Sequence, residues 1–182
     1  MKSAPLVQRT LRVEGRKGVD LRLVAGDARF VRQPVLLGHY RTETLTGTEQ
    51  TMDRLLGGAL RRSIRAGLYP TEPGAHQIFD NLARPPENPW QLPRPEAVVV
   101  VGLGNDGGLR AEALERTVRQ GVLAWMRGLC EGGQAHGERE LAATLVGSGG
   151  GGVSADVAAR GVAHGVREVN LVLRALGWPI VT

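Results

Sequence analysis

The residues best suited to chemistry form a glycine-rich segment in the last quarter of the chain. Four consecutive glycines follow an apolar run at 141–146 and precede Ser154, which starts a helical pattern. Successive glycines can aim several backbone N–H groups into one concavity, and a helix N-terminus adds partial positive charge, so a phosphate can bind there without a cationic side chain. The candidate phosphate-binding residues are Gly147, Ser148, Gly149, Gly150, Gly151 and Gly152. The alternative is a flexible connection that lets the helix pack closely against the sheet, and the sequence leaves both open.

A second glycine-rich loop lies between an apolar strand pattern and the next helical pattern. Residues 102–107 read G-L-G-N-D-G and formally match G-x-G-x-x-G, the pattern of dinucleotide-binding loops. The dinucleotide interpretation is incomplete, because the next strand ends in Val146 and Gly147 with no acidic residue placed to hold a ribose hydroxyl. It therefore stands as a secondary candidate loop and not as a Rossmann cofactor site. Its candidate residues are Gly102, Gly104, Asn105 and Asp106.

The remaining residues show no evident catalytic or metal-binding set. Ser148 lies in G-S-G, which is not the G-x-S-x-G of a nucleophile elbow. The single cysteine, Cys130, comes at a predicted helix end and is more simply a spare thiol than a nucleophile. The four histidines lack metal-ligand spacing and fall on separate predicted elements: His39, His76, His136 and His164. We expect no metal and no cofactor. Whether the chain is an enzyme stays open, although these residues favour a protein that is not one.

The elements that must position these loops alternate between strands and helices. Residues 97–101 are wholly apolar and mostly β-branched, which is typical of a parallel strand buried on both faces. The predicted strands lie at 35–40, 76–79, 97–101 and 141–146. Apolar residues at helical spacing predict three helices, between Thr46 and Gly67, over 109–129, and between Ser154 and Gly177. Strands alternating with helices indicate an α/β fold with a parallel or mixed sheet covered on both faces.

The chain divides into an N-terminal extension and one main domain. The chain has 182 residues and a mass of 19.5 kDa, which is the size of a single domain. Residues 1–33 alternate in period two around a glycine-flanked turn and predict a β-hairpin extension, and residues 34–182 form the main domain. Five prolines between 82 and 95 exclude a helix or a central strand there and predict an exposed loop. The last residues end as though another strand were beginning, so an excerpt of a longer protein is one expectation.

The charge of the chain is basic without the pattern of a nucleic-acid surface. The net charge of +5 and the pI of about 10.3 come almost wholly from arginine, with lysine only at Lys2 and Lys17. The arginines are scattered, and no aromatic residues lie between them as stacking platforms, so nucleic acid is the least supported partner. A single cysteine excludes a disulfide framework. No apolar run is long enough for a signal peptide or a membrane span, so we expect a cytoplasmic protein with no membrane partner.

Taken in order, several segments resemble a known family. They are residues 44–47 (T-L-T-G), 55–60 (L-L-G-G-A-L) and 98–104 (V-V-V-V-G-L-G). In this order they are similar to the N-terminal domain of the dizinc leucyl aminopeptidases, which has a macro-domain-like fold. Residues 145–168 are also similar to the phosphate loop and last helix of macro domains. The resemblance implies a three-layer αβα fold with a mixed, mostly parallel sheet, and it extends the candidate phosphate loop to Val153.

A narrower resemblance rests on residues 34–40 and 67–70. The sequence P-V-L-L-G-H-Y followed by G-L-Y-P looks like the aminopeptidase-N-like module of large bacterial proteins that carry a CHAT (caspase-like) protease domain. The aminopeptidase's catalytic domain, with its zinc-binding lysine and carboxylates, is missing, so peptidase activity is not expected. Residues 38–41 (G-H-Y-R) stand where macro domains have an Asn-Ala-Asn stretch that contacts a ribose, so only the phosphate loop carries over.

Functions of three different classes follow from these observations. The first is a non-catalytic interaction or regulatory module of a larger bacterial signalling or defence protein of the CHAT type. Its partner would be a protein, another domain of the same polypeptide or a second copy of the chain. The alternative is a nucleotide or ADP-ribose sensor that binds a diphosphate at residues 147–152, with the nucleotide as ligand and not as cofactor. The third, nucleic-acid binding through the arginines, predicts a steep dependence on salt.

Overall fold

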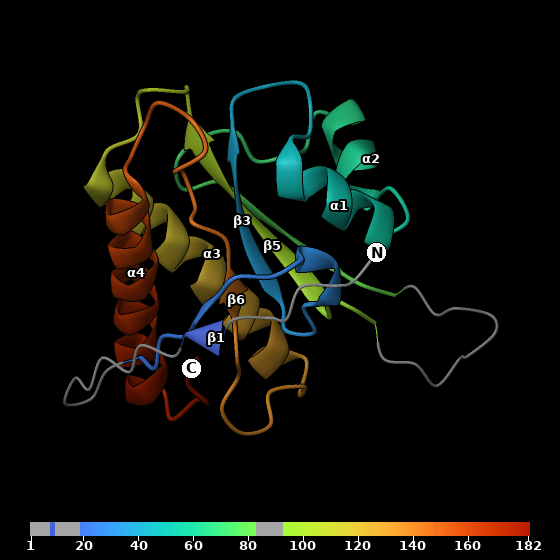
Figure 1. Cartoon of the computed structure of the whole chain (residues 1–182). Coiled ribbons are helices and arrows are strands. Elements are labelled where there is room, and N and C mark those ends of the chain that lie inside the picture. The colour runs from blue at the N-terminus through green and yellow to red at the C-terminus, as the bar shows by residue number, and fades with distance from the viewer. Residues whose placement is uncertain (1–7, 10–18, 83–92) are drawn as a thin grey trace.

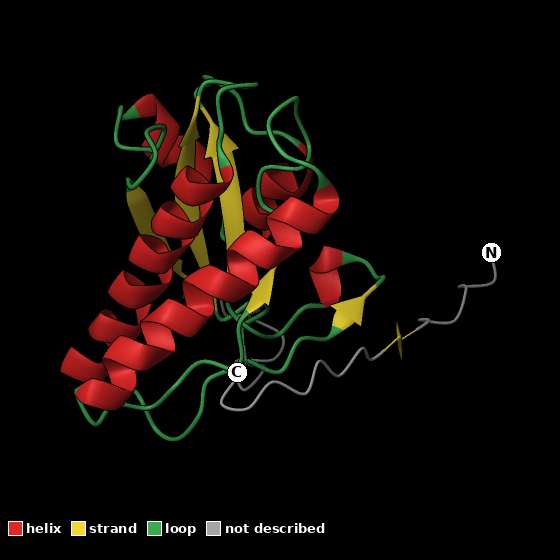
Figure 2. Ribbon diagram, turned by 90° about the vertical axis from the view of Figure 1, so that its left-hand side faces the viewer, coloured by secondary structure: helices red, strands yellow, loops and turns green. Residues whose placement is uncertain are grey.

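The computed structural model describes residues 8–9, 19–82 and 93–182, whose main body is a three-layer αβα sandwich (Figure 1). A four-stranded sheet forms the middle layer, and its strands are β3 (Val35–Tyr40), β4 (His76–Asp80), β5 (Ala97–Gly104) and β6 (Ala142–Ala143). The helices are α1 (Gly47–Leu55), α2 (Ala59–Arg65), α3 (Ala111–Glu131) and α4 (Ala155–Ala175). Helices α1 and α2 cover one face of the sheet, and α3 and α4 cover the other (Figures 1 and 2). The expected α/β class and three-layer architecture are confirmed.

The central sheet is mixed and mostly parallel. Its strand order is β4-β5-β3-β6, in which β3 runs parallel to both of its neighbours and the edge strand β4 runs antiparallel to β5. Every residue of β5 is buried, as expected for a strand with helices on both faces. The pairing of β3 with β5 shifts between His39 and Tyr40, so that Tyr40 lies opposite Gly104. This irregularity occurs at the carboxyl ends of both strands.

Alternation along the strands divides the apolar core into two parts. Leu36, Val99 and Val101 face α3 and α4, whereas Leu37, Val98 and Val100 face α1 and α2. Two glycines of α4 allow it to lie close to α3. A Cβ at Gly165 would be 2.7 Å from Val118 Cγ1, and one at Gly161 would be 2.7 Å from Leu114 Cδ2. At these two glycines the backbone of α4 therefore lies directly against side chains of α3, and the two long helices pack closely (Figure 2).

The single helix predicted between Thr46 and Gly67 is wrong, because the chain breaks it into α1 and α2. Gly57 and Gly58 adopt φ values of +60° and +84°, a left-handed conformation that glycine accepts without steric cost. Asp53 explains the break. Its backbone carbonyl accepts from the Gly58 N–H at 2.7 Å, and its buried carboxylate accepts from the Arg61 N–H at 2.9 Å. The end of α1 thus caps the start of α2.

The predicted strand at 141–146 is wrong in extent. Only Ala142 and Ala143 pair with β3, and the Thr144 N–H adds one more bond to the Leu36 carbonyl at 3.1 Å. The Val146 N–H then bonds back to the Thr144 carbonyl at 2.8 Å, which turns the chain out of the sheet. Leu145 is 42% exposed at this turn. The segment is a short edge strand followed by a turn.

The N-terminal part contains a small antiparallel pair of strands, β1 (Gln8–Arg9) and β2 (Leu23–Val24), followed by a short 3₁₀ helix at Ala28–Phe30. The predicted hairpin at 1–33 falls partly outside the described residues, as does most of the proline-rich loop at 82–95. The division of the chain at residues 33 and 34 stays a prediction. Within the described residues, none of the helices is both long and apolar enough to cross a membrane.

Candidate functional site

The topology gathers the candidate loops at one edge of the sheet. Because β3 and β5 are parallel, their carboxyl ends lie together, and α1 and α3 begin shortly after them. The segment that precedes α4 reaches the same edge, at the top of Figure 1. Three helix N-termini therefore lie at this edge, where their partial positive charge favours an anion. This is the position at which ligands bind in open α/β sheets.

The structure brings the two glycine-rich loops into contact through Asp106. Its Oδ1 atom accepts from the Gly107 N–H at 2.9 Å and from the Gly151 N–H, also at 2.9 Å. Asp106 comes from the loop after β5, and Gly151 from the loop before α4. A Cβ at Gly150 would overlap Oδ1 and lie 2.9 Å from Cγ of the same side chain. The sequence treats these loops as separate candidates, whereas the structure places them in contact.

Two residues of the secondary loop belong to the strand instead. Gly102 and Gly104 are buried members of β5 and line up against the segment before β4. A Cβ at Gly102 would overlap the Glu72 carbonyl oxygen, and Gly104 has a φ of +77° while its N–H bonds to the Thr71 carbonyl at 2.8 Å. These glycines allow a close backbone approach, which explains the G-x-G pattern without a ligand. Only Asn105 and Asp106 of this candidate set are exposed in the loop.

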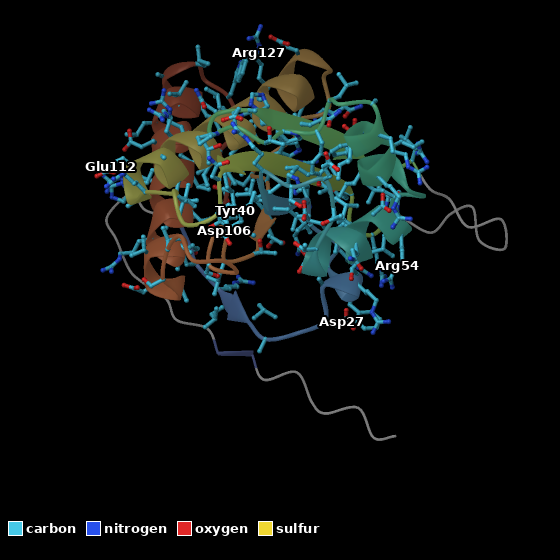
Figure 3. All side chains as sticks on the ribbon, turned by 90° about the horizontal axis from the view of Figure 1, so that it is seen from above. Asp27, Tyr40, Arg54, Asp106, Glu112 and Arg127 are labelled. Atoms are coloured by element: carbon cyan, nitrogen blue, oxygen red, sulfur yellow. The ribbon has the colours of Figure 1, made fainter. Side chains whose placement is uncertain are left out.

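Tyr40 supports the other side of the glycine loop. Its hydroxyl donates to the Gly147 carbonyl at 2.7 Å, and a Cβ at Gly152 would lie 2.6 Å from the hydroxyl oxygen of Tyr40. Burial, and then the negative charge of Asp106, raise the pKa of the Tyr40 phenol. Figure 3 shows Tyr40 and Asp106 next to each other in the view onto this edge. The sequence analysis missed this role of Tyr40, since a strand-end tyrosine carries no signal of what it contacts.

Several amides of the loop at 147–153 are available to a ligand. In the described part of the chain, the N–H groups of Gly149, Gly150, Gly152 and Val153 donate to no protein atom. Ser148 differs, because both its N–H and its hydroxyl donate to the Leu145 carbonyl, at 3.0 and 2.8 Å. The structure thus brings Gly147 to Val153 together as one turn, within which Ser148 maintains the turn itself.

The start of α4 carries an acidic residue of its own. Ser154 is the N-cap, as expected, but its hydroxyl donates to the Asp156 carboxylate and accepts no capping bond from a backbone N–H. This hydrogen bond lowers the pKa of Asp156, which also pairs with Arg160 one turn further on. A negative charge in the first turn of a helix interacts favourably with the helix dipole.

A buried polar cluster lies on the opposite face of β3. The Glu49 carboxylate accepts from the Tyr69 hydroxyl at 3.0 Å and lies 2.8 Å from His39 Nδ1, while its other oxygen accepts from the Thr46 N–H at 3.1 Å. His39 Nε2 lies 3.1 Å from the Thr42 carbonyl. Each ring nitrogen of His39 thus lies within hydrogen-bond distance of an oxygen. The cluster joins α1 to β3 and does not reach the glycine loops.

The other residues considered for chemistry in the sequence are the four histidines and Cys130. Across residues 8–9, 19–82 and 93–182, no three histidine, cysteine or acidic side chains gather as a group that could hold a metal ion. Cys130 is half-buried near the end of α3, and burial raises the pKa of its thiol. A raised pKa disfavours the thiolate that a nucleophile requires.

No protein-family model and no curated protein sequence matches the chain. Its fold is macrodomain-like, as comparison with solved structures shows. The macrodomain of Mycobacterium tuberculosis DarG superposes with a TM-score of 0.53 at 13% identity, covering 87% of this chain and 92% of the other. Thermosipho africanus DarTG, solved in complex with ADP-ribose, gives a TM-score of 0.56 at 12% identity; the match covers 88% of this chain and 40% of that longer one. The macro-domain part of the sequence resemblance is thereby confirmed at the level of fold.

Proposed function

We propose that the chain binds ADP-ribose or a related nucleoside diphosphate through the loop at 147–153. The observation that carries this proposal is the group of amides that donate to no other atom of the described protein, at Gly149, Gly150, Gly152 and Val153. Each N–H can satisfy one phosphate oxygen, and the helix that follows adds its dipole. Several such donors in one turn suit a diphosphate better than a single monoanion.

The location and the fold support the same ligand. The loop lies at the carboxyl edge of the parallel strands, beside the segment that leads into α3. A protein with a similar fold, the Thermosipho protein, is described in complex with ADP-ribose. This proposal is one of binding and not of hydrolysis. The two polar side chains beside the loop, Asp106 and Tyr40, both hold backbone groups of the loop in this structure.

Calorimetric titration with ADP-ribose, with AMP and inorganic phosphate as comparison ligands, tests the proposal. The variant Gly150→Asp introduces a Cβ that overlaps Asp106 and adds a second carboxylate to the loop, so saturable binding should be lost. Gly128→Asp is the matched control, because Gly128 is exposed on α3 and its missing Cβ faces open space. Circular dichroism checks that both variants fold.

Three results of this titration would count against the proposal. One is the absence of heat from the wild-type chain at millimolar ADP-ribose. A second is unchanged affinity in Gly150→Asp. The third is binding of an oligonucleotide that falls steeply with salt and does not respond to Gly150→Asp, which would favour the arginine-based nucleic-acid function instead.

A second candidate function is a protein-interaction module, and exposed apolar side chains favour it. Phe30 is 70% exposed, Leu23 59% and Leu82 85%, all near the N-terminal segment or the proline-rich loop. In its finer form this is the aminopeptidase-N-like, non-catalytic module of a CHAT-type bacterial protein that the sequence suggests. Sedimentation of the purified chain tests its self-association. A dimer that dissociates in Phe30→Asp would support the module, whereas a monomer at all concentrations would exclude a homo-oligomer.

A further inference from the structure

The glycine loop already holds an anion that belongs to the chain itself. The Asp106 carboxylate accepts from the Gly151 N–H, in the middle of the loop proposed to bind phosphate. A carboxylate and a phosphate oxygen make the same kind of charge-assisted bond to a backbone amide. The side chain therefore occupies the position that a ligand oxygen needs in order to reach Gly151.

Steric contact makes the two occupants mutually exclusive. The carboxylate lies so close over Gly150 that even a Cβ there would overlap Oδ1 and come within 3.1 Å of Oδ2. Nothing but hydrogen fits between the loop backbone and this side chain. A ligand oxygen bonded to the Gly151 N–H would displace Asp106 and would otherwise meet its negative charge at contact distance.

The side chain is free to leave. Asp106 is exposed and, within the described ranges, forms no ion pair with a cationic side chain. It is followed by Gly107, with a φ of +76°, and by Gly108, which leave the loop little side-chain packing to hold it. Among the described residues, a single hydrogen bond, to the Gly151 N–H, attaches Asp106 to the loop at 147–153.

We propose that Asp106 is an internal competitor that sets the affinity of the glycine loop: it holds the Gly151 amide in the free protein and is displaced when an anionic ligand binds. This inference rests on the proposed function of the loop. If Asp106 instead has only a structural role, holding the two loops together, the opposite result is expected. Removing a structural contact loosens the loop and weakens ligand binding, whereas removing a competitor strengthens ligand binding.

Calorimetry on Asp106→Asn and Asp106→Ala, with ADP-ribose and with inorganic phosphate, separates the two roles. Asparagine removes the charge at nearly constant shape, and alanine removes the acceptor as well. We expect the Kd of either ligand to fall roughly tenfold, the worth of one hydrogen bond to a charged group. Glu112→Gln is the control, since it removes one negative charge from the first turn of α3 at a place well apart from Asp106 (Figure 3). Its Kd should change by less than about twofold, because separated surface charges are screened.

The outcomes distinguish this inference from the function on which it rests. If the wild-type chain binds and both Asp106 variants bind equally or more weakly, the competitor is refuted while the binding site stands. If neither the wild type nor the variants bind, the proposed function is refuted and the competitor with it. Binding that appears only in the variants supports both. Hydrogen exchange of the free protein gives an independent readout, since the Gly151 amide should exchange faster in Asp106→Ala than in wild type.

Discussion

Replacing Gly152 by alanine is expected to destabilise the protein through Tyr40. The new Cβ would lie 2.6 Å from the Tyr40 hydroxyl oxygen and 3.2 Å from Leu109 Cβ, well inside the normal contact distance of about 3.5 Å. The phenol can only move aside by giving up its 2.7 Å hydrogen bond to the Gly147 carbonyl. Gly149 offers a matched control in the same loop, because a Cβ there meets open space. Neither glycine has a positive φ, so the comparison isolates the contact.

The contacts set the size of each effect. Overpacking of this kind costs about 1–3 kcal/mol, while Gly149→Ala should stay within about 0.5 kcal/mol of wild type. Tyr40→Phe loses one partly buried hydrogen bond, worth about 1 kcal/mol. In the double variant the hydroxyl is absent, so the worst overlap disappears: the nearest ring carbon lies 3.6 Å from the new Cβ, and only the 3.2 Å contact with Leu109 Cβ remains. We therefore expect the two changes together to cost about 1 kcal/mol less than their sum.

Urea unfolding of the wild type and the four variants, followed by circular dichroism, measures this coupling. The reasoning fails if Gly152→Ala is as stable as Gly149→Ala. It also fails if the costs of Gly152→Ala and Tyr40→Phe add to within about 0.3 kcal/mol, because distant, independent sites behave in that way. Either result would mean that the hydroxyl and the loop backbone are not in contact.

Two further predictions concern the helix pair and the tyrosines. Gly165→Ala should destabilise the chain by about 1–3 kcal/mol in urea unfolding, despite the better helix propensity of alanine. Its Cβ would lie 2.7 Å from a Val118 methyl and 3.1 Å from a backbone carbonyl of α3. The control is Gly128→Ala, whose Cβ meets open space and which should be neutral or stabilising. In an alkaline titration followed by tyrosinate absorbance, the chain's two tyrosines should both ionise above the ordinary tyrosine pKa of 10.0, since burial raises the pKa of Tyr40 and that of Tyr69. Because the pKa values of both tyrosines are raised in the native protein, their contribution to the free energy of unfolding is complete below pH 10.0 and is lost as pH rises through the native pKa values. Asp106→Asn should bring the pKa of Tyr40 part of the way down. A normal titration of both tyrosines would contradict their burial.

The layered fold could be predicted because its signals are local. Apolar β-branched residues at 97–101 define the middle strand, and apolar residues at helical spacing define the two long helices. The ends of elements were less predictable, since they depend on partners distant in sequence. Gly102 and Gly104 extend β5 because the segment before β4 bonds to them, and nothing in the local sequence reports that segment.

The same limit applies to the candidate site. The glycines at 147–152 are conspicuous in the sequence, and their proximity to a helix start follows from their order. Their contact with Asp106 does not, because 45 residues separate Asp106 from Gly151. The support from Tyr40 depends likewise on a pairing across 107 residues. Sequence reasoning thus finds the loop that offers donors but not the side chains that compete for them or hold them.

The end of β3 has a consequence for how the strand is aligned in the sheet. His39 is buried on the face of α1, against Glu49 and Tyr69, and the next residue, Tyr40, points to the other face and bonds to Gly147. A slip by one residue would exchange the two faces, turning the imidazole toward apolar Leu109 and the phenol toward the Glu49 carboxylate. Both polar anchors would then be lost at once. Two adjacent side chains with partners on opposite faces therefore make a one-residue slip of this strand costly, which helps to fix the register of the strand beside the candidate site.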